Sequence, residues 1–314
     1  MIFQHWYLSR YPAVFRSMTG LSVTDFATLF DDLQDAFAAS EVTRHTRPTR
    51  QRAIGGGAQF RFCPRDQLLC TVVWLRQYPT NEALAYFFGV SDSTVSRAIS
   101  RWLPLLEQAG EDTFRLPDPG RKQRRQVDAV LADQPGLLIL VDSFEQPVQR
   151  PKERAEADKY YSGKKKDHTI KGQVAINEIT GKIVDVPESV PGPTADIKLL
   201  EASKLAERLP GDIGLGGDLA YVGADKLHPQ GLVVTPRRKP RGQERPAADI
   251  EYNRAFSRRR VTVEHTIGLM RRYQAITQLD RHHRQHHTER VRAIAGLVNR
   301  RLERWVAYRE RQAA

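Results

Sequence analysis

The feature that most constrains this chain is an unbroken run of aliphatic residues, 137–141, that ends in the carboxylate of Asp142. Pro135 and Gly136 bound the run, and its length and composition predict a strand covered on both faces. The next side chain then emerges at the end of the strand, where α/β proteins build their sites. Asp142 is therefore a candidate site residue, although an aspartate in this position is also a common turn residue or helix cap.

A second acid follows a similar pattern. Residues 213–217 read Ile-Gly-Leu-Gly-Gly and precede Asp218, and the glycines allow either close backbone packing or the approach of a ligand. A third acid, Glu264, lies in a predicted helix at residues 258–273, where a glutamate taken alone is most often a solvated residue. Together, two strand-borne aspartates and a helix-borne glutamate would form an all-oxygen cluster suited to Mg²⁺ or Mn²⁺.

The chain is strongly basic, with 49 Lys and Arg residues against 37 Asp and Glu residues and a net charge of +12. An excess of this size favours a polyanionic partner. The arginines also cluster, at residues 44–52, 121–125, 237–241 and 258–260, which favours nucleic acid over an ordinary basic protein. These observations indicate metal-dependent chemistry on nucleic acid.

No apolar stretch approaches the ~18 residues of a membrane span, and the N-terminus lacks the charged-then-apolar order of a signal peptide. We therefore expect a cytoplasmic, nucleoid-associated protein. The two cysteines, Cys63 and Cys70, fit neither a zinc motif nor a disulfide framework. We expect both to be buried, reduced thiols.

The pattern of the chain changes near residue 110. We predict a helical N-terminal DNA-binding region over residues 1–110, a basic linker over residues 111–130 and a second domain over residues 131–310. Within the first region, Ser22 and Asp25 predict a capped helix, and residues 41–60 predict a break with a flexible, glycine-containing linker.

Three helices are predicted within residues 64–104, with Ala85, Gly89 and Val95 at the spacing of a helix-turn-helix. The last helix would turn Val95, Ile99 and Trp102 toward the core. Its other face would carry Ser93, Thr94, Ser96, Arg97, Ser100 and Arg101. Short or cationic side chains suit a helix in the major groove, although a solvated face of a three-helix packing unit has the same composition.

Strands dominate the second domain. The strand ending at Asp142 is followed by a hairpin (169–176 and 182–186), a helix (196–209), the Asp218 strand, a short strand (232–234), a basic loop (235–246), the Glu264 helix and a final helix from residue 288. This order predicts an open mixed sheet flanked by helices, and hence an α/β fold class.

Several longer motifs resemble those of a known family. They are VDSFEQPVQRP (141–151), YYSGKKKDHT (160–169), GDLAYVG (217–223), TPRRKPRG (235–242) and RVTVEH (260–265). The chain resembles bacterial insertion-sequence transposases of the DDE superfamily, in the group related to Harbinger-type transposases, from about residue 15 to residue 305. The resemblance implies a ribonuclease-H-like catalytic core preceded by the all-α helix-turn-helix region.

The resemblance implies that Asp142, Asp218 and Glu264 form a catalytic, metal-binding triad for Mg²⁺ or Mn²⁺. Around the glutamate, Arg260 matches the family pattern, Arg271 stands in for its lysine and Ser257 occupies its tyrosine position. Arg260 and Arg271 share the face of Glu264 and would hold a DNA strand near the metals.

The implied function is a DNA transposase that binds the terminal inverted repeats of its own insertion sequence, cleaves there and transfers the 3′-hydroxyl ends to target DNA. Its implied partners are double-stranded DNA, both transposon ends and target, and a second copy of the chain, because two ends must be paired. The alternative is a domesticated, non-catalytic DNA-binding regulator, against which the intact triad argues.

Three further features leave alternatives open. His168 and Lys171 on the predicted hairpin are DNA-facing residues or part of a solvated strand face. Glu145 is a further ligand or supporting group of the metal site, or belongs to a structural loop. The histidine-rich run at residues 282–287 favours a polar or DNA-contacting turn over a zinc site, because no Cys or carboxylate partner is evident.

Overall fold

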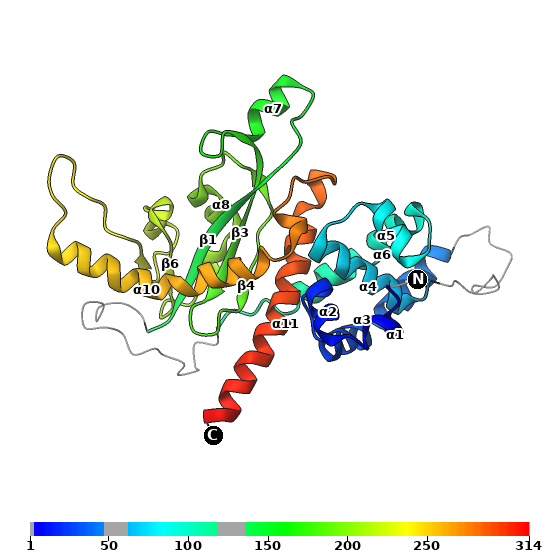
Figure 1. Cartoon of the computed structure of the whole chain (residues 1–314). Helices are drawn as coiled ribbons and strands as arrows, with labels where there is room; N and C mark the ends of the chain where they lie inside the picture. The colour runs from blue at the N-terminus through cyan, green and yellow to red at the C-terminus, as the bar shows by residue number, and fades with distance from the viewer. Residues whose placement is uncertain (1–2, 47–61, 118–135, 314) are drawn as a thin grey trace.

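The computed structural model describes residues 3–46, 62–117 and 136–313. It contains a helical N-terminal part, a mixed α/β part and a long C-terminal helix that lies between them (Figure 1). The predicted fold class, a mixed-sheet core preceded by an all-α helix-turn-helix region, is confirmed. Within the described ranges, no helix is long and apolar enough to cross a membrane.

The N-terminal part contains α1 (His5–Leu8), α2 (Pro12–Thr19), α3 (Val23–His45), α4 (Pro64–Gln77), α5 (Asn81–Phe88) and α6 (Asp92–Glu111). The predicted cap of α3 is confirmed, because the Ser22 hydroxyl accepts a hydrogen bond from the Asp25 amide at 3.0 Å. The predicted break after residue 40 is wrong, since α3 continues to His45 with an ion pair between Arg44 and Glu41 in its last turns. The glycines at 55–57 lie outside the described residues.

Helices α4, α5 and α6 form the predicted helix-turn-helix. Gly89 ends α5 with φ +66°, a left-handed conformation that favours glycine. Val95, Ile99 and Trp102 of α6 are buried, as their spacing predicts. The expectation that both thiols are buried is wrong for Cys63, which is exposed at the N-cap of α4, whereas Cys70 is buried inside that helix.

The second part is built on one mixed sheet. Its strands are β1 (Leu138–Pro147), β2 (Tyr161–Ser162), β3 (Asp167–Asn177), β4 (Ile183–Asp185), β5 (Val190–Pro191), β6 (Gly214–Gly216) and β7 (Val233–Val234). They are ordered β2-β3-β1-β6-β7, with β4 and β5 also paired to β3. The neighbours β1, β6 and β7 run parallel, and β3 runs antiparallel to β1.

The sequence predicted that the first strand ends at Asp142, but β1 continues to Pro147. It does so because β3 pairs with it along this length, as far as Thr169 opposite Pro147. On the other edge, β6 pairs with β1 only from Leu138 to Leu140. Asp142 therefore lies in the middle of one strand, just beyond the end of the parallel pairing.

The two faces of the sheet are covered by different helices. Leu138, Leu140 and Phe144 belong to the core shared with α10 (Ala247–Met270) and α11 (His287–Ala313). Ile139 and Val141 face the core that contains residues of α8 (Asp196–Ser203) and α9 (Leu205–Arg208). The predicted single helix over 196–209 is thus interrupted, because Lys204 adopts a left-handed conformation with φ 52°. A short helix, α7 (Arg154–Tyr160), completes this part.

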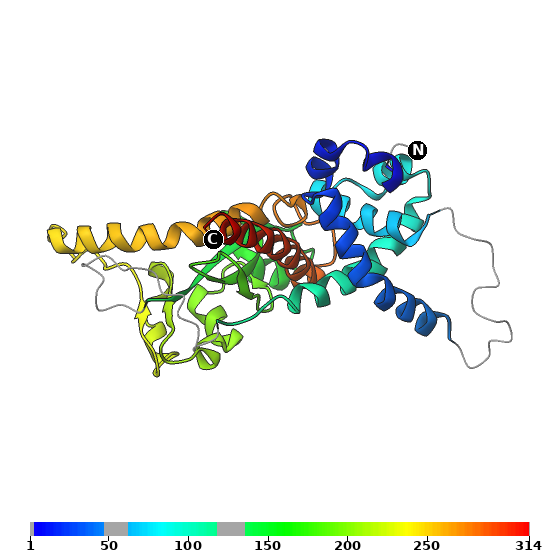
Figure 2. The same ribbon diagram turned by 90° about the horizontal axis from the view of Figure 1, so that it is seen from below.

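The helix-turn-helix is attached to the core by direct helix contact. Helix α6 packs along α11 (Figures 1 and 2), and the two backbones meet at a pair of glycines. A Cβ added to Gly296 would lie 2.3 Å from the Cα of Gly110. The linker was predicted to begin at residue 111, but this residue is still part of α6, which packs on α11. Residues 118–135 lie outside the described chain.

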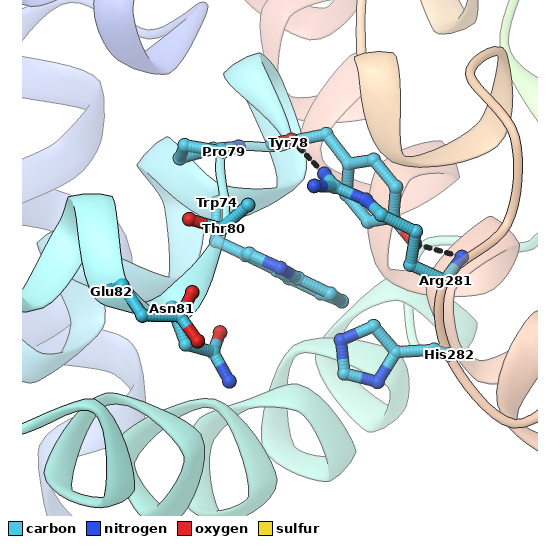
Figure 3. A pocket seen from close by; sticks show the side chains of 8 residues that line it. All are labelled: Trp74, Tyr78, Pro79, Thr80, Asn81, Glu82, Arg281 and His282. Atoms are coloured by element: carbon cyan, nitrogen blue, oxygen red, sulfur yellow. Dashed lines mark hydrogen bonds between the residues drawn. The ribbon is translucent and has the colours of Figure 1, made fainter.

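A buried polar network reinforces this junction. Asp280 forms an ion pair with Arg290 and accepts a hydrogen bond from the Tyr78 hydroxyl at 3.1 Å. Arg281 donates to the Tyr78 carbonyl and stacks over its ring. Beside these residues a cavity of about 290 Å³ is lined by Trp74, Tyr78, Pro79, Thr80, Asn81, Glu82, Arg281 and His282 (Figure 3). The end of α4 and the chain before α11 are therefore held together.

The glycine contact gives a testable expectation. Gly296→Ala should lower the free energy of unfolding by about 1–3 kcal/mol, because the added methyl group meets the α6 backbone and separates the two helices. Gly268→Ala is the matched control, since no atom lies within 4 Å of its added Cβ in α10, and it should be neutral or stabilising by up to about 1 kcal/mol. Urea denaturation measures both, and equal effects would contradict this account of the junction.

Candidate active site

Asp142 and Asp218 lie side by side at one edge of the sheet. Leu140 of β1 is paired with Gly216 of β6 in a parallel ladder, and each aspartate lies two residues further along its own chain. Asp218 also caps the short 3₁₀ helix η2 (Leu219–Tyr221), where its carboxylate accepts a hydrogen bond from the Ala220 amide at 2.8 Å. Parallel strand ends thus bring two acids together that are far apart in sequence.

The Asp142 carboxylate is held in a partly desolvated position. Its Oδ1 accepts a hydrogen bond from the Ser143 amide at 2.8 Å, and its Oδ2 lies 3.6 Å from Nη2 of Arg260 on α10. Burial raises the pKa of Asp142, and the nearby charges of Asp218 and Asp196 raise it further, against the opposing effects of Ser143 and Arg260. A cation bound at this edge would compensate the Asp142 carboxylate for its lost solvation and would reduce its repulsion by Asp218 and Asp196.

Tyr221 forms the wall of the site behind the glycines. A Cβ added to Gly217 would lie 2.6 Å from the Tyr221 ring, so here the glycine permits close packing. The Tyr221 hydroxyl donates to Gln173 Oε1 at 3.2 Å. Burial, followed by the charges of Asp196, Asp142 and Asp218, raises the pKa of Tyr221 well above its usual value. The phenol therefore stays neutral beside the acids.

Asp196, the first residue of α8, is a site residue that the sequence reasoning missed. Its Oδ1 accepts hydrogen bonds from Lys171 Nζ at 2.7 Å and from Ser143 Oγ at 3.0 Å. In the sequence, Asp196 only starts an amphipathic helix, where an acid is common for reasons of helix stability. The sequence around Asp196 does not show that this helix begins beside Asp142.

This contact corrects the expectation for Lys171. Its side chain is buried, and its ammonium group binds the Thr194 carbonyl and Asp196. It is therefore not on an exposed strand face, and we leave it out of the proposed DNA-binding surface. His168, earlier on β3, is half-buried with its ring against Tyr161.

Helix α10 contributes the remaining predicted residues. Arg260 reaches Asp142, and Glu264 is exposed one helical turn later. The helix ends at Met270, earlier than predicted, so that Arg271 is its exposed C-cap. Among the described residues, no group of three acidic, histidine or cysteine side chains is close enough to hold a metal ion. The structure thus brings Asp142, Asp218 and Arg260 together, and Glu264 stays a prediction.

Glu145 and the histidine-rich run are both held by contacts within the chain. Glu145 lies on β1 and accepts a hydrogen bond from the Thr169 hydroxyl at 2.7 Å, so it is on a strand and not in a loop. The histidine-rich run forms a turn and the start of α11. There His282 packs on Trp74, His286 pairs with Glu289, and His287 hydrogen-bonds Ser189.

The predicted recognition face of α6 is only partly open. Ser93 and Arg97 are exposed, and the Arg97 guanidinium bonds back to the Ser93 carbonyl at 2.9 Å. Thr94 is half-buried beside the Ser91 cap. Arg101 is half-buried and lies 3.6 Å from Glu41 of α3, so its charge is already partly engaged.

Comparison with known proteins finds matches to both parts of the chain. Residues 141–299 match the family described as DDE superfamily endonuclease, and residues 61–112 match the helix-turn-helix of DDE superfamily endonuclease. The chain is 28% identical over 292 residues to a probable transposase for insertion sequence element IS702 from Microchaete diplosiphon, which covers 92% of this chain and 94% of that protein. No solved structure matches the chain.

One family match falls in each of the two parts of the structure. The first begins one residue before Asp142 and includes Asp218, Arg260 and Glu264, and the second covers α4 to α6. The sheet edge with its paired acids thus lies within the first match, and the helix-turn-helix lies within the second. The chain therefore belongs to the DDE superfamily endonucleases, as a transposase of the bacterial insertion-sequence type with a helix-turn-helix DNA-binding domain.

Proposed function

We propose that this transposase binds the terminal inverted repeats of its own insertion sequence, cleaves at the ends and transfers the 3′-hydroxyl ends to target DNA. The observation that carries the proposal is the pair of adjacent carboxylates, Asp142 and Asp218, at an open edge of the sheet with Arg260 beside them. Pairing of two ends requires at least two copies of the chain.

The acids suit a divalent metal ion. Asp142 and Asp218 offer hard oxygen ligands, and the raised pKa of Asp142 reflects burial and repulsion that a cation would offset. We infer that these two residues hold Mg²⁺ or Mn²⁺ and that Glu264 completes the set from α10. When bound, the metal would activate a water or 3′-hydroxyl and stabilise the leaving oxygen during in-line attack on a phosphodiester.

Arg260 is the residue that we assign to the DNA strand at this edge. Its Nε is buried without a hydrogen-bond partner among the described residues, and its Nη2 faces Asp142. A buried, unused N–H is costly unless a ligand satisfies it. A guanidinium can hold a phosphate through two hydrogen bonds, so Arg260 would position the scissile phosphate beside the carboxylates. Arg271 and His168 are secondary candidates for the neighbouring phosphates.

Sequence recognition is assigned to α6. Ser93 and Arg97 are exposed on the face opposite the buried Val95, Ile99 and Trp102, which suits insertion into the major groove. Thr94 and Arg101 flank them, and Arg101 would have to leave Glu41 to reach a base or phosphate. We therefore expect Arg97 to contribute more than Arg101.

The test uses duplexes that carry the inverted repeats from the DNA bordering the gene, and scrambled versions of them. Arg97→Ala should weaken binding to the repeat by about 1–3 kcal/mol if Arg97 reads a guanine edge. Lys226→Ala, which removes an exposed charge on the core, should bind like the wild type. Unchanged binding by Arg97→Ala would remove this residue from the recognition surface.

The wild-type protein provides the decisive comparison. Specific binding together with Mg²⁺-dependent cleavage of the repeat supports the proposal. Specific binding without cleavage or strand transfer, at any Mg²⁺ or Mn²⁺ concentration, would instead establish the domesticated DNA-binding regulator.

A further inference from the structure

A basic projection leads away from the active site. We define the basic arm as residues 235–258, the loop after β7 together with the first half of α10. It contains seven Lys and Arg residues and three Asp and Glu residues. The arm extends beyond the sheet on the side away from the helix-turn-helix (Figures 1 and 2). Tyr252, Ala255 and Phe256 anchor its α10 segment in the core, whereas the loop segment carries the exposed basic residues Arg238, Lys239 and Arg241.

The base of the arm is well organised. Arg237 donates its amide to Asn253 Oδ1 at 2.8 Å, and Asn253 Nδ2 donates back to the Arg237 carbonyl at 3.0 Å. The Arg237 side chain pairs with Asp249 at 3.0 Å and stacks over Tyr252 at 4.1 Å. These contacts fasten the loop to α10 and use one of the three acids internally.

Positive charge continues from the active site along the arm. Arg238 is exposed and lies 3.4 Å from the carbonyl of Leu219, the residue after Asp218. Further out, the side chains of Lys239 and Arg241 are exposed. Within the described parts of the chain neither of them forms an ion pair. A charged surface that starts beside the reacting acids and leads outward matches a phosphate backbone.

We propose that the basic arm binds the phosphate backbone of the duplex DNA that flanks the cleavage site, on the side away from the helix-turn-helix. The proposal rests on the proposed function, because it takes α6 to hold the inverted repeat. If α6 holds the repeat and the cleavage site lies at Asp142 and Asp218, the flanking DNA continues past the active site toward the arm. Contacts to phosphates carry no sequence information, which suits DNA that differs at every insertion site.

The length of α10 sets the reach of the arm. Arg260, which contacts Asp142, lies 13 residues after Ala247, the first residue of the helix. At 1.5 Å per residue this distance is about 20 Å, and with one phosphate per 3.4 Å of each strand it corresponds to roughly six base pairs. Arg237 is fastened to Asn253, seven residues before Arg260 and hence about 10 Å along the helix. Lys239 and Arg241 follow Arg237, so a flank of about 3 base pairs should end before it reaches them.

The experiment compares inverted-repeat duplexes with about 3 or about 20 base pairs of flank, bound without metal at about 50–200 mM salt. The wild type should bind the long-flank duplex more tightly and with a steeper salt dependence. The double variant Lys239→Ala, Arg241→Ala should bind it roughly tenfold more weakly, with the slope of log K against log salt reduced by about 2. Its binding and Mg²⁺-dependent cleavage of the short-flank duplex should match the wild type.

The matched control is the double variant Lys204→Ala, Lys226→Ala, which removes two exposed charges outside the arm and should behave as the wild type on both duplexes. Three results would overturn the proposal: no effect of flank length on the wild type, equal losses on both duplexes, or a defect confined to strand transfer into target DNA. Failure of the proposed function gives a different result, in which the repeat and its scrambled version bind alike; that result removes the basis of the arm proposal as well.

Discussion

Asp142→Asn, Asp218→Asn and Glu264→Gln should each abolish Mg²⁺-dependent cleavage of the inverted repeat while binding to the same DNA is retained. Each change replaces a carboxylate with a neutral amide of nearly the same size, so packing around β1, β6 and α10 is preserved. In the proposed function the metal serves the chemistry of phosphodiester attack, and losing several kcal/mol of transition-state stabilisation corresponds to a fall in rate of about 10³-fold or more.

Two measurements separate this loss from a structural defect. Binding of Mn²⁺ to the free protein, followed by calorimetry, should weaken in the Asp142 and Asp218 variants, whereas DNA affinity without metal should stay within about twofold of the wild type. Asp225→Asn, which removes an exposed acid shortly after the site, should retain full activity. Near-normal strand transfer by the Glu264→Gln variant would exclude Glu264 from the triad, which matters because the structure leaves this residue exposed.

The second large effect is expected at the buried ion pair between Asp280 and Arg290, which lies beside the contact between α4 and the chain before α11. Asp280→Ala should lower the free energy of unfolding by about 3–5 kcal/mol, because it leaves a buried guanidinium without its counter-charge. Arg290 is fully buried, and Asp280 also accepts hydrogen bonds from the Tyr78 hydroxyl and the His282 amide. All three interactions lie at the contact between α4 and the chain before α11.

The control is an exposed acid–arginine pair that links α3 to α11. Asp32 of α3 lies 2.7 Å from Arg300 of α11, and both side chains are partly exposed to solvent. Asp32→Ala should cost at most about 1 kcal/mol, because exposed ion pairs contribute little. Urea denaturation of both variants measures the difference, and similar losses would show that burial does not decide the strength of these pairs.

The double variant Asp280→Leu, Arg290→Met should recover most of the stability, since a buried pair can be replaced by apolar residues.

Much of the fold could be predicted from the sequence because its signals are local. The apolar run at 137–141 predicted the central strand, and Ser22 with Asp25 predicted the cap of α3. The spacing of Ala85, Gly89 and Val95 predicted the helix-turn-helix, since each of these residues acts within a few positions of its neighbours. Boundaries were less certain, and β1 continues past Asp142 because β3 pairs with it.

The sequence by itself determined the identity and order of the main strands and helices, although not α7, β2 or β5. It also singled out Asp142 and Asp218 as acids that follow apolar segments. Only the tertiary structure decided which distant residues meet: Asp196 and Lys171 at the active site, Gly110 against Gly296 between the helices, and Tyr78 with Asp280 in the junction. The physical reason is that periodicity and capping act over a few residues of chain, whereas burial and ion pairing depend on contacts between segments far apart in sequence, which form only when the sheet and its covering helices pack together.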